Sequence, residues 1–383
     1  LRRPLRLRVP SGQIHMDRGQ PAASLPDHER VLALEPSADA LNNRGLALMR
    51  LDRFDPALAD FEAAMKMDPD LVWPWFNRAV IRARQGQVDA ALEDFNRAVT
   101  LDPGNHRVYA ERVLLLKQMG DVAGALRDYD RLAQLRPEDP AIFEERAYLH
   151  LQIGEPARAL ADAQALQRIN PASAISYRIA GFAQAQLGNH REALAAYGES
   201  IRLAPEEAES FYRRAQVHLD MVKFSAALKD LDQAITLDPT HLHAHLSRAW
   251  VLEKRGLLRK ALADYDRAAE LDGGMADIFF NRGWINMQLK RHDAAVGDYK
   301  TVYRLDPGYQ GIRNNIGWAY LKAGRPALAV PELLLSIAQG TSDKAVGNLE
   351  RALSQLGYNP GKIDGLMSEQ THTAINAWKA DNP

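Results

Sequence analysis

The chain has 383 residues, of which 48 are Lys or Arg and 49 are Asp or Glu, so its formal net charge of -1 gives no basic surface for nucleic acid or an anionic membrane. It contains no cysteine, which excludes disulfides, thiol catalysis and cysteine-based metal sites. No apolar run approaches the roughly 18 residues of a transmembrane helix, so no transmembrane segment is expected.

The first 37 residues precede the regular part of the sequence. Residues 1–26 begin with a basic stretch and are expected to form an irregular leader, and His15 and Met16 resemble a cloning-site remnant, so the part up to about residue 16 is interpreted as vector-derived. Residues 27–37 have the pattern of the second helix of a helical hairpin. They are predicted to be a partial repeat or an N-terminal cap.

From residue 38 onwards the sequence repeats every 34 residues. An alanine followed by Leu or Val recurs nine times at this spacing, at Ala57, Ala91, Ala125, Ala159, Ala193, Ala227, Ala261, Ala295 and Ala329. An aromatic residue stands four places after most of these alanines, and a proline follows at the same period. A small residue on each helix permits two helices to approach closely, and a proline ends the second one.

This pattern resembles the tetratricopeptide repeat. The resemblance covers residues 38–341 and implies nine units that start at residues 38, 72, 106, 140, 174, 208, 242, 276 and 310, the ninth running into a linker. Each unit is then a pair of helices that cannot bury its apolar face alone and must stack on its neighbours. The predicted fold is all-α, a right-handed α-solenoid whose first helices line a concave surface.

Two charged places recur together within the unit. The seventh place is Arg and the twenty-third is Asp in the same seven units, whereas the fifth unit has Ala180 and Ala196 and the ninth has Ile316 and Glu332. Paired loss of both partners predicts a structural ladder of ion pairs between the two helices of a unit. The alternative is a row of arginines that binds acidic ligands.

The concave surface is predicted to bind a protein or peptide partner. Aromatic side chains that helix packing does not require indicate a recognition surface, and asparagine amides can bond an extended peptide backbone. The predicted groove residues are the aromatics at the ninth place and the asparagines at the sixth, namely Tyr148, Phe182, Trp250, Trp284, Trp318, Asn43, Asn77, Asn281 and Asn315. The alternative is that these aromatics only pack against one another.

Residues 342–383 depart from the repeat. A helical pattern, the segment from Gly357 to Gly365 and a second helical pattern resemble the small peptidoglycan-binding-like domain. Gly361 and Gly365 are expected to have positive φ, Ile363 to fill the core and Asp364 to accept backbone N–H groups. The resemblance implies a glycan site at Tyr358, Asp364, Thr371 and Trp378, and the alternative is that the module only caps the solenoid.

No catalytic motif stands in its structural context, so no catalytic residue, cofactor or metal site is predicted and the chain is interpreted as a non-enzymatic scaffold. His241 and His245 share one helix face but lack a carboxylate or thiol at a recognised metal-ligand spacing.

The resemblance of the last module places the scaffold in the periplasm or envelope of a bacterium, tethered to peptidoglycan. Two alternatives remain open. One is a cytoplasmic assembly scaffold with a C-terminal cap, and the other is the regulatory region of a larger enzyme whose catalytic domain lies outside this chain.

Overall fold

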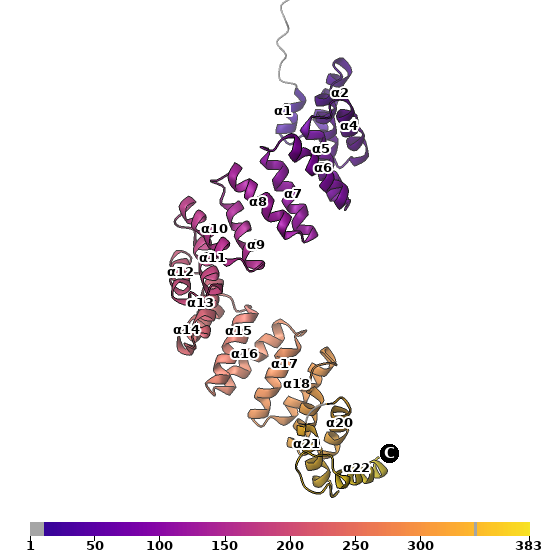
Figure 1. Cartoon of the computed structure of the whole chain (residues 1–383), viewed down its shortest axis with the longest axis vertical. Helices are drawn as coiled ribbons and strands as arrows, with labels where there is room; N and C mark the ends of the chain where they lie inside the picture. The colour runs from indigo at the N-terminus through magenta and orange to yellow at the C-terminus, as the bar shows by residue number, and fades with distance from the viewer. Residues whose placement is uncertain (1–10, 341–342) are drawn as a thin grey trace, which may run out of the picture. The chain divides into compact units, whose positions relative to one another are not determined.

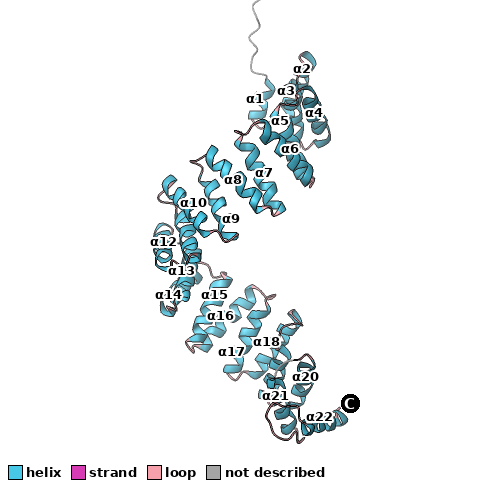
Figure 2. Ribbon diagram, viewed as in Figure 1, coloured by secondary structure: helices cyan, strands magenta, loops and turns pink. Residues whose placement is uncertain are grey.

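The computed structural model describes residues 11–340 and 343–383, and every regular element in these ranges is an α-helix (Figure 2). The predicted all-α fold is therefore confirmed. Residues 1–10 of the predicted leader and residues 341 and 342 at the predicted module boundary lie outside the described residues.

The chain divides into two compact units, residues 1–187 and 188–383 (Figure 1). The helices of the first unit are α1 (Ser11–Asp17), α2 (Pro21–Leu34), α3 (Ala38–Arg50), α4 (Phe54–Met67), α5 (Val72–Arg84), α6 (Val88–Leu101), α7 (His106–Met119), α8 (Val122–Leu135), α9 (Pro140–Gln152), α10 (Pro156–Ile169) and α11 (Ala174–Gln186). Those of the second are α12 (His190–Leu203), α13 (Ala208–Asp220), α14 (Phe224–Leu237), α15 (Leu242–Lys254), α16 (Leu258–Leu271), α17 (Ala276–Gln288), α18 (His292–Leu305), α19 (Ile312–Lys322), α20 (Pro326–Ala338), α21 (Asp343–Gln355) and α22 (Glu369–Asp381). The division falls inside the fifth repeat, which lacks the Arg and Asp of the ladder.

Helices α1 and α2 differ from the irregular leader that was expected over residues 1–26. They pack against each other, Met16 is buried, and its carbonyl accepts a hydrogen bond from Arg50 Nη1 at 3.1 Å. Pro26 lies inside α2, where a proline disfavours helix. Packing of α2 on α1 and α3 therefore overrides the local propensity.

The remaining helices of each unit form successive hairpins, α3 with α4, α5 with α6 and so on, each also in contact with the next hairpin of the same unit. In repeats one to eight, the first helix begins at the residue expected from the 34-residue period. In the ninth repeat it begins at Ile312, two residues after the expected start, because the preceding Gly311 has a left-handed backbone.

The small residues of the repeat lie where two helices touch. All nine alanines of the twentieth place are completely buried. A Cβ atom added at Gly45 would lie 2.6 Å from the Phe61 ring, and one at Gly283 would lie 2.7 Å from the Tyr299 ring. In these repeats, the large side chain that follows the ladder aspartate therefore packs against the small residue at the eighth place.

The turn between the two helices of a repeat needs one left-handed residue. Glycine supplies it in six repeats, with φ near +75°. Asp52, Val222 and Lys290 occupy the same place with φ of 56°, 57° and 59°. These three residues carry a conformational cost that glycine does not.

All seven predicted Arg–Asp pairs form within their own repeats, so the structural ladder is confirmed. In Arg78–Asp94, for example, Nε donates to Oδ2 at 2.9 Å and Nη2 to Oδ1 at 2.7 Å. The same partners meet in Arg44–Asp60, Arg112–Asp128, Arg146–Asp162, Arg214–Asp230, Arg248–Asp264 and Arg282–Asp298. Each aspartate is buried.

The ladder also joins neighbouring repeats, which the sequence reading missed. The free Nη1 of Arg146 donates to Asp130 of the preceding repeat at 2.8 Å, and Arg248 bonds Asp232 in the same way. These acceptors stand two places after the ladder aspartate. An acidic or amide residue recurs at that place in several repeats, and this recurrence could have predicted the bonds between neighbouring repeats.

The C-terminal module continues the stack. Helix α21 packs on α19 and α20, and Asn348 donates to Asn314 of the ninth repeat at 3.0 Å. Leu349 and Leu353 join one apolar cluster with residues of the last repeats. Helix α21 thus occupies the place of the first helix of a further repeat.

Candidate functional site

The predicted groove aromatics differ in exposure. Tyr148, Trp250 and Trp284 are 39%, 40% and 47% exposed, and Phe182 and Trp318 are half-buried. Trp318 contacts the apolar cluster of the last repeats, and the Lys322 ammonium lies 4.4 Å from its ring centre. Packing therefore uses part of this set, while Trp284 keeps almost half of its surface open.

The predicted asparagines also divide into two kinds. Asn77 is buried and donates its amide to Asn42 Oδ1 at 2.9 Å, so half of that amide serves the stack of α3 on α5. The side chains of Asn43, Asn281 and Asn315 are half-buried, with no hydrogen bond to another described residue. These three retain the full capacity to bond a ligand.

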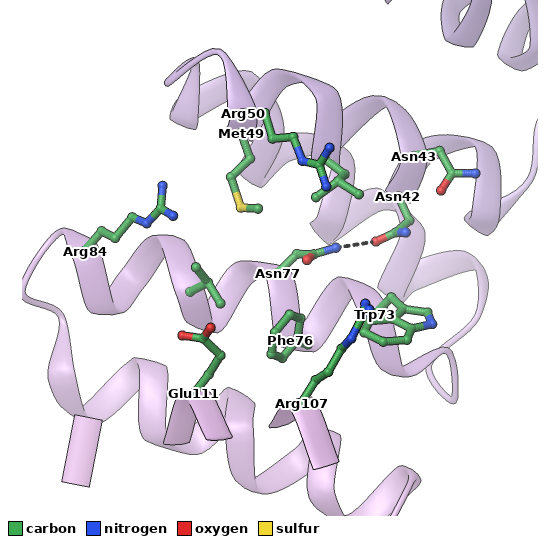
Figure 3. Close-up of a pocket in the computed structure, with 12 residues that line it drawn as sticks. Asn42, Asn43, Met49, Arg50, Trp73, Phe76, Asn77, Arg84, Arg107 and Glu111 are labelled. Carbon is green, nitrogen blue, oxygen red and sulfur yellow. Dashed lines mark hydrogen bonds between the residues drawn. The ribbon is translucent and has the colours of Figure 1, made fainter. Parts of the chain in front are cut away.

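One pocket of about 420 Å³ lies over the first helices α3, α5 and α7, and we call it the N-terminal pocket (Figure 3). Its residues are Asn42, Asn43, Leu46, Met49, Arg50, Trp73, Phe76, Asn77, Val80, Arg84, Arg107 and Glu111. Trp73 and Phe76 meet edge to face with ring centres 5.8 Å apart. The Asn77–Asn42 bond crosses between the two helices that form one side (Figure 3).

The N-terminal pocket is positively charged. It contains three arginines and a single carboxylate, Glu111. Within the described residues Arg84 and Arg107 form no ion pair, and Arg50 bonds only the Met16 carbonyl. The ladder arginines, by contrast, are all paired, so the charge available to a partner comes from residues outside the repeat pattern.

A second pocket of about 580 Å³ lies where the ninth repeat meets the C-terminal module, and we call it the junction pocket. Its residues are Trp284, Asn314, Asn315, Trp318, Lys344, Gly347, Asn348, Arg351, Ile363, Asp364 and Gly365. Three predicted groove residues and one predicted glycan residue therefore line a single pocket. The sequence placed them in two separate sites.

The other three predicted glycan residues have structural partners. Thr371 is completely buried, and its hydroxyl oxygen lies 3.2 Å from each of two acceptors, Glu350 Oε1 and the Pro360 carbonyl. The Tyr358 hydroxyl donates to Asp381 at 2.8 Å, and Trp378 packs on the apolar cluster. Thr371 is thus a structural residue, because it holds the loop to α21.

The loop between α21 and α22 agrees with its predicted backbone but not with its predicted core. Gly361 and Gly365 have φ of 81° and 78°, and Asp364 Oδ1 accepts the Leu366 N–H at 3.1 Å, as expected. Ile363 was expected to fill the core but is 43% exposed. The buried carboxylate of Glu350 anchors the loop instead by accepting the Gly365 N–H at 3.0 Å.

The histidine pair of α15 has structural partners. His245 contacts Asp264 at 3.0 Å, and His241 accepts the Ala244 N–H and contacts Glu209 at 3.2 Å. The hydrogen bond from His241 lowers the pKa of Glu209 to about 2. Neither ring is placed for a shared metal, and the described part of the chain contains no cluster of three or more metal-ligating side chains.

The described helices include none with the length and apolar character needed to cross a bilayer.

Sequence models of two kinds of domain match the chain. Models described as "Tetratricopeptide repeat" match residues 38–71, 72–105, 111–174, 181–241, 212–276, 246–310 and 280–345. A model described as "Putative peptidoglycan binding domain" matches residues 342–382. No curated protein matches the chain.

Several solved structures are similar. YrrB, described as "a TPR protein with an unusual peptide-binding site", is 22% identical, with 48% of this chain and 95% of that chain covered and a TM-score of 0.40. A tetratricopeptide repeat protein from Parabacteroides merdae is 19% identical, with 74% and 99% covered and a TM-score of 0.42. Pseudomonas aeruginosa pilF is 20% identical, with 53% and 92% covered and a TM-score of 0.47. The family assignment rests on the sequence models, which span more than half of the chain.

Proposed function

Because this chain belongs to the tetratricopeptide repeat family, a family of protein-interaction scaffolds, we propose that it binds an extended, acidic segment of a partner protein in the N-terminal pocket. The proposal gives no residue a catalytic role and needs no cofactor.

One observation carries this proposal: three arginines face a pocket that contains a single carboxylate. Arginine forms bidentate hydrogen bonds with carboxylates, and cations without partners on a protein surface attract ligands of opposite charge. Trp73 and Phe76 add an apolar contact, and Asn43 can bond a peptide backbone. An acidic segment that also carries an apolar side chain meets all of these groups.

The test is selection of random displayed peptides on the intact chain. We expect the selected peptides to be enriched in Asp and Glu and to bind more weakly as salt rises. Charge reversal by Arg84→Glu with Arg107→Glu should weaken their binding about tenfold or more, which corresponds to about 1.4 kcal/mol. Both side chains are exposed, so the fold should persist.

The matched control is Arg127→Glu, an exposed arginine of the second helix α8 outside the pocket. It should leave peptide affinity unchanged. Selection of neutral peptides, or equal losses in the control and the double variant, would remove the basis of the proposal.

A second candidate function is a tether to peptidoglycan in a bacterial envelope, supported by the family match of residues 342–382. The competing role is that of a cap, supported by the packing of α21 on the last repeat. Co-sedimentation of the intact chain with purified peptidoglycan sacculi separates the two. A chain that stays in the supernatant is capped rather than tethered, and the envelope location then loses its support in favour of a cytoplasmic scaffold.

A further inference from the structure

Three of the four residues that the family resemblance implies for glycan binding have structural partners. Thr371 is buried, Tyr358 bonds Asp381, and Trp378 packs on the apolar cluster. Asp364, the fourth residue implied by the family resemblance, lines a pocket that is shared with the repeats.

We propose that the junction pocket is a binding site for a carboxylate-bearing glycan, with its aromatic surface supplied by the repeats and its charged groups by the module. This inference rests on the peptidoglycan tether put forward as the second candidate function. It moves the site from the module alone to a pocket that neither part forms by itself.

The pocket matches both the apolar face and the hydroxyl rim of a sugar ring. A sugar presents an apolar face, which packs against aromatic rings, and a rim of hydroxyls that both donate and accept. Trp284 and Trp318 line the pocket beside the amide of Asn315, which can also both donate and accept, and the Asp364 carboxylate, which accepts.

Two cations of the pocket suit a carboxylate on the ligand. Lys344 and Arg351 line the pocket and form no ion pair within the described residues. Arg351 uses one nitrogen to bond Asn348 at 3.1 Å and keeps its other donors. A carboxylate on the glycan would give both cations an ion-pair partner. An acidic peptide would satisfy these two cations as well, but it lacks the apolar ring face and the hydroxyl rim that Trp284, Trp318 and Asn315 match.

Hydrogen bonds within the protein hold the walls of the pocket in place. Asn348 bonds Asn314 across the junction, and the completely buried Glu350 accepts the Gly365 N–H. A Cβ at Gly347 would lie 3.6 Å from Gly365 Cα, so the loop lies close against α21. Preformed walls reduce the entropy that binding must overcome.

The experiment is co-sedimentation of full-length variants with purified sacculi, with melting temperature recorded for each variant. Trp284→Ala and Lys344→Glu alter exposed pocket residues and should each lower the bound fraction about fivefold or more, close to 1 kcal/mol, at unchanged melting temperature. Their controls are Leu328→Ala and Lys379→Glu, which alter exposed residues outside the pocket and should pellet like the wild type.

The possible outcomes are distinct. If the wild type pellets with sacculi and the two pocket variants lose binding while the two controls keep it, the inference is supported. Wild-type pelleting that neither pocket variant changes overturns the junction site and leaves the tether intact. A wild-type chain that does not pellet overturns both. Soluble poly-glutamate and a soluble glycan fragment are compared as competitors at equal charge concentration. If poly-glutamate releases the chain from sacculi as well as the fragment does, the pocket recognises charge alone, and the glycan assignment is overturned.

Discussion

The N-terminal pocket is formed by repeats alone, whereas the junction pocket takes one wall from the last repeats and the other from the module. Both contain an Asn–Asn hydrogen bond between adjacent helices, two aromatic residues and cations without carboxylate partners. The supports behind them differ. Bidentate Arg–Asp pairs hold the first three repeats, while the two helices of the ninth repeat are joined by the pair of Arg313 with Glu332 at 2.8 Å.

Helices can therefore stack in the same way although different interactions stabilise the stack. Helix α21 reaches a repeat-like position through apolar packing and the Asn348–Asn314 hydrogen bond, without the ladder. A pocket on the first helices therefore needs correctly spaced helices, and more than one set of interactions can space them.

The largest expected effect comes from removing an ion-pair acceptor near each pocket, Asp94 in the second repeat and Glu332 in the ninth. Asp94 accepts three hydrogen bonds, two from Arg78 and one from Arg82, so Asp94→Ala should lower the free energy of unfolding by about 3 kcal/mol. Glu332→Ala removes a more exposed partner and should cost about 1 kcal/mol. Urea denaturation measures both, and equal losses would contradict the difference between the ends.

A smaller effect should follow from adding one methyl group at a helix crossing. Gly45→Ala pushes Cβ to 2.6 Å from the Phe61 ring and should cost about 1 to 3 kcal/mol. Gly347→Ala meets only ordinary contacts in the module and should be neutral or stabilising by about 0.5 kcal/mol, because alanine favours helix. Thermal unfolding of the two variants tests this, and a loss of similar size at both would show that α21 packs as tightly as a repeat helix.

Two turns allow a stabilising test of the same comparison. Val222 is β-branched and left-handed, and Val222→Gly should raise the free energy of unfolding by about 1 kcal/mol. Asp52→Gly, beside the N-terminal pocket, should gain only a few tenths, since Asp tolerates this conformation better. The two melting temperatures give the order, and a larger gain at Asp52 would contradict the strain argument.

The smallest expected effect is the share of the pH dependence of stability that His28 of α2 contributes. Burial lowers the pKa of His28 below its ordinary value of 6.5, and its Nε2 has no hydrogen-bond partner among the described residues. The unfolded chain therefore takes up this proton at a higher pH than the folded chain, and the stability contributed by neutral His28 is lost as pH falls below about 6.5.

We expect His28→Leu to lose less melting temperature than the wild type between about pH 7.5 and pH 5.5. The other histidines are common to both chains, so the difference isolates His28. Parallel decreases would show that this ring is not responsible.

Much of the fold followed from the sequence because the repeat imposes it locally. A 34-residue period fixes which residues share a helix face, and the paired recurrence of Arg and Asp, lost together in the fifth and ninth repeats, indicated the ladder before any distance was known. The helix starts and the left-handed glycines follow from the same local rules.

The sites followed only in part. Trp284, Trp318, Asn315 and Asp364 were each singled out, but nothing in the spacing indicated that they line one pocket. The unpaired Arg84 and Arg107 were missed because they do not recur, and periodicity reveals only what every repeat shares.

Within the repeats, the sequence by itself determined the helices, their pairing and the residues at each crossing, since these recur every 34 residues. The tertiary structure alone decided that Ile363 is exposed and Thr371 buried, and that α21 stacks on the ninth repeat. Those outcomes depend on which surface the module meets, and contacts between segments of different pattern leave no period in the sequence.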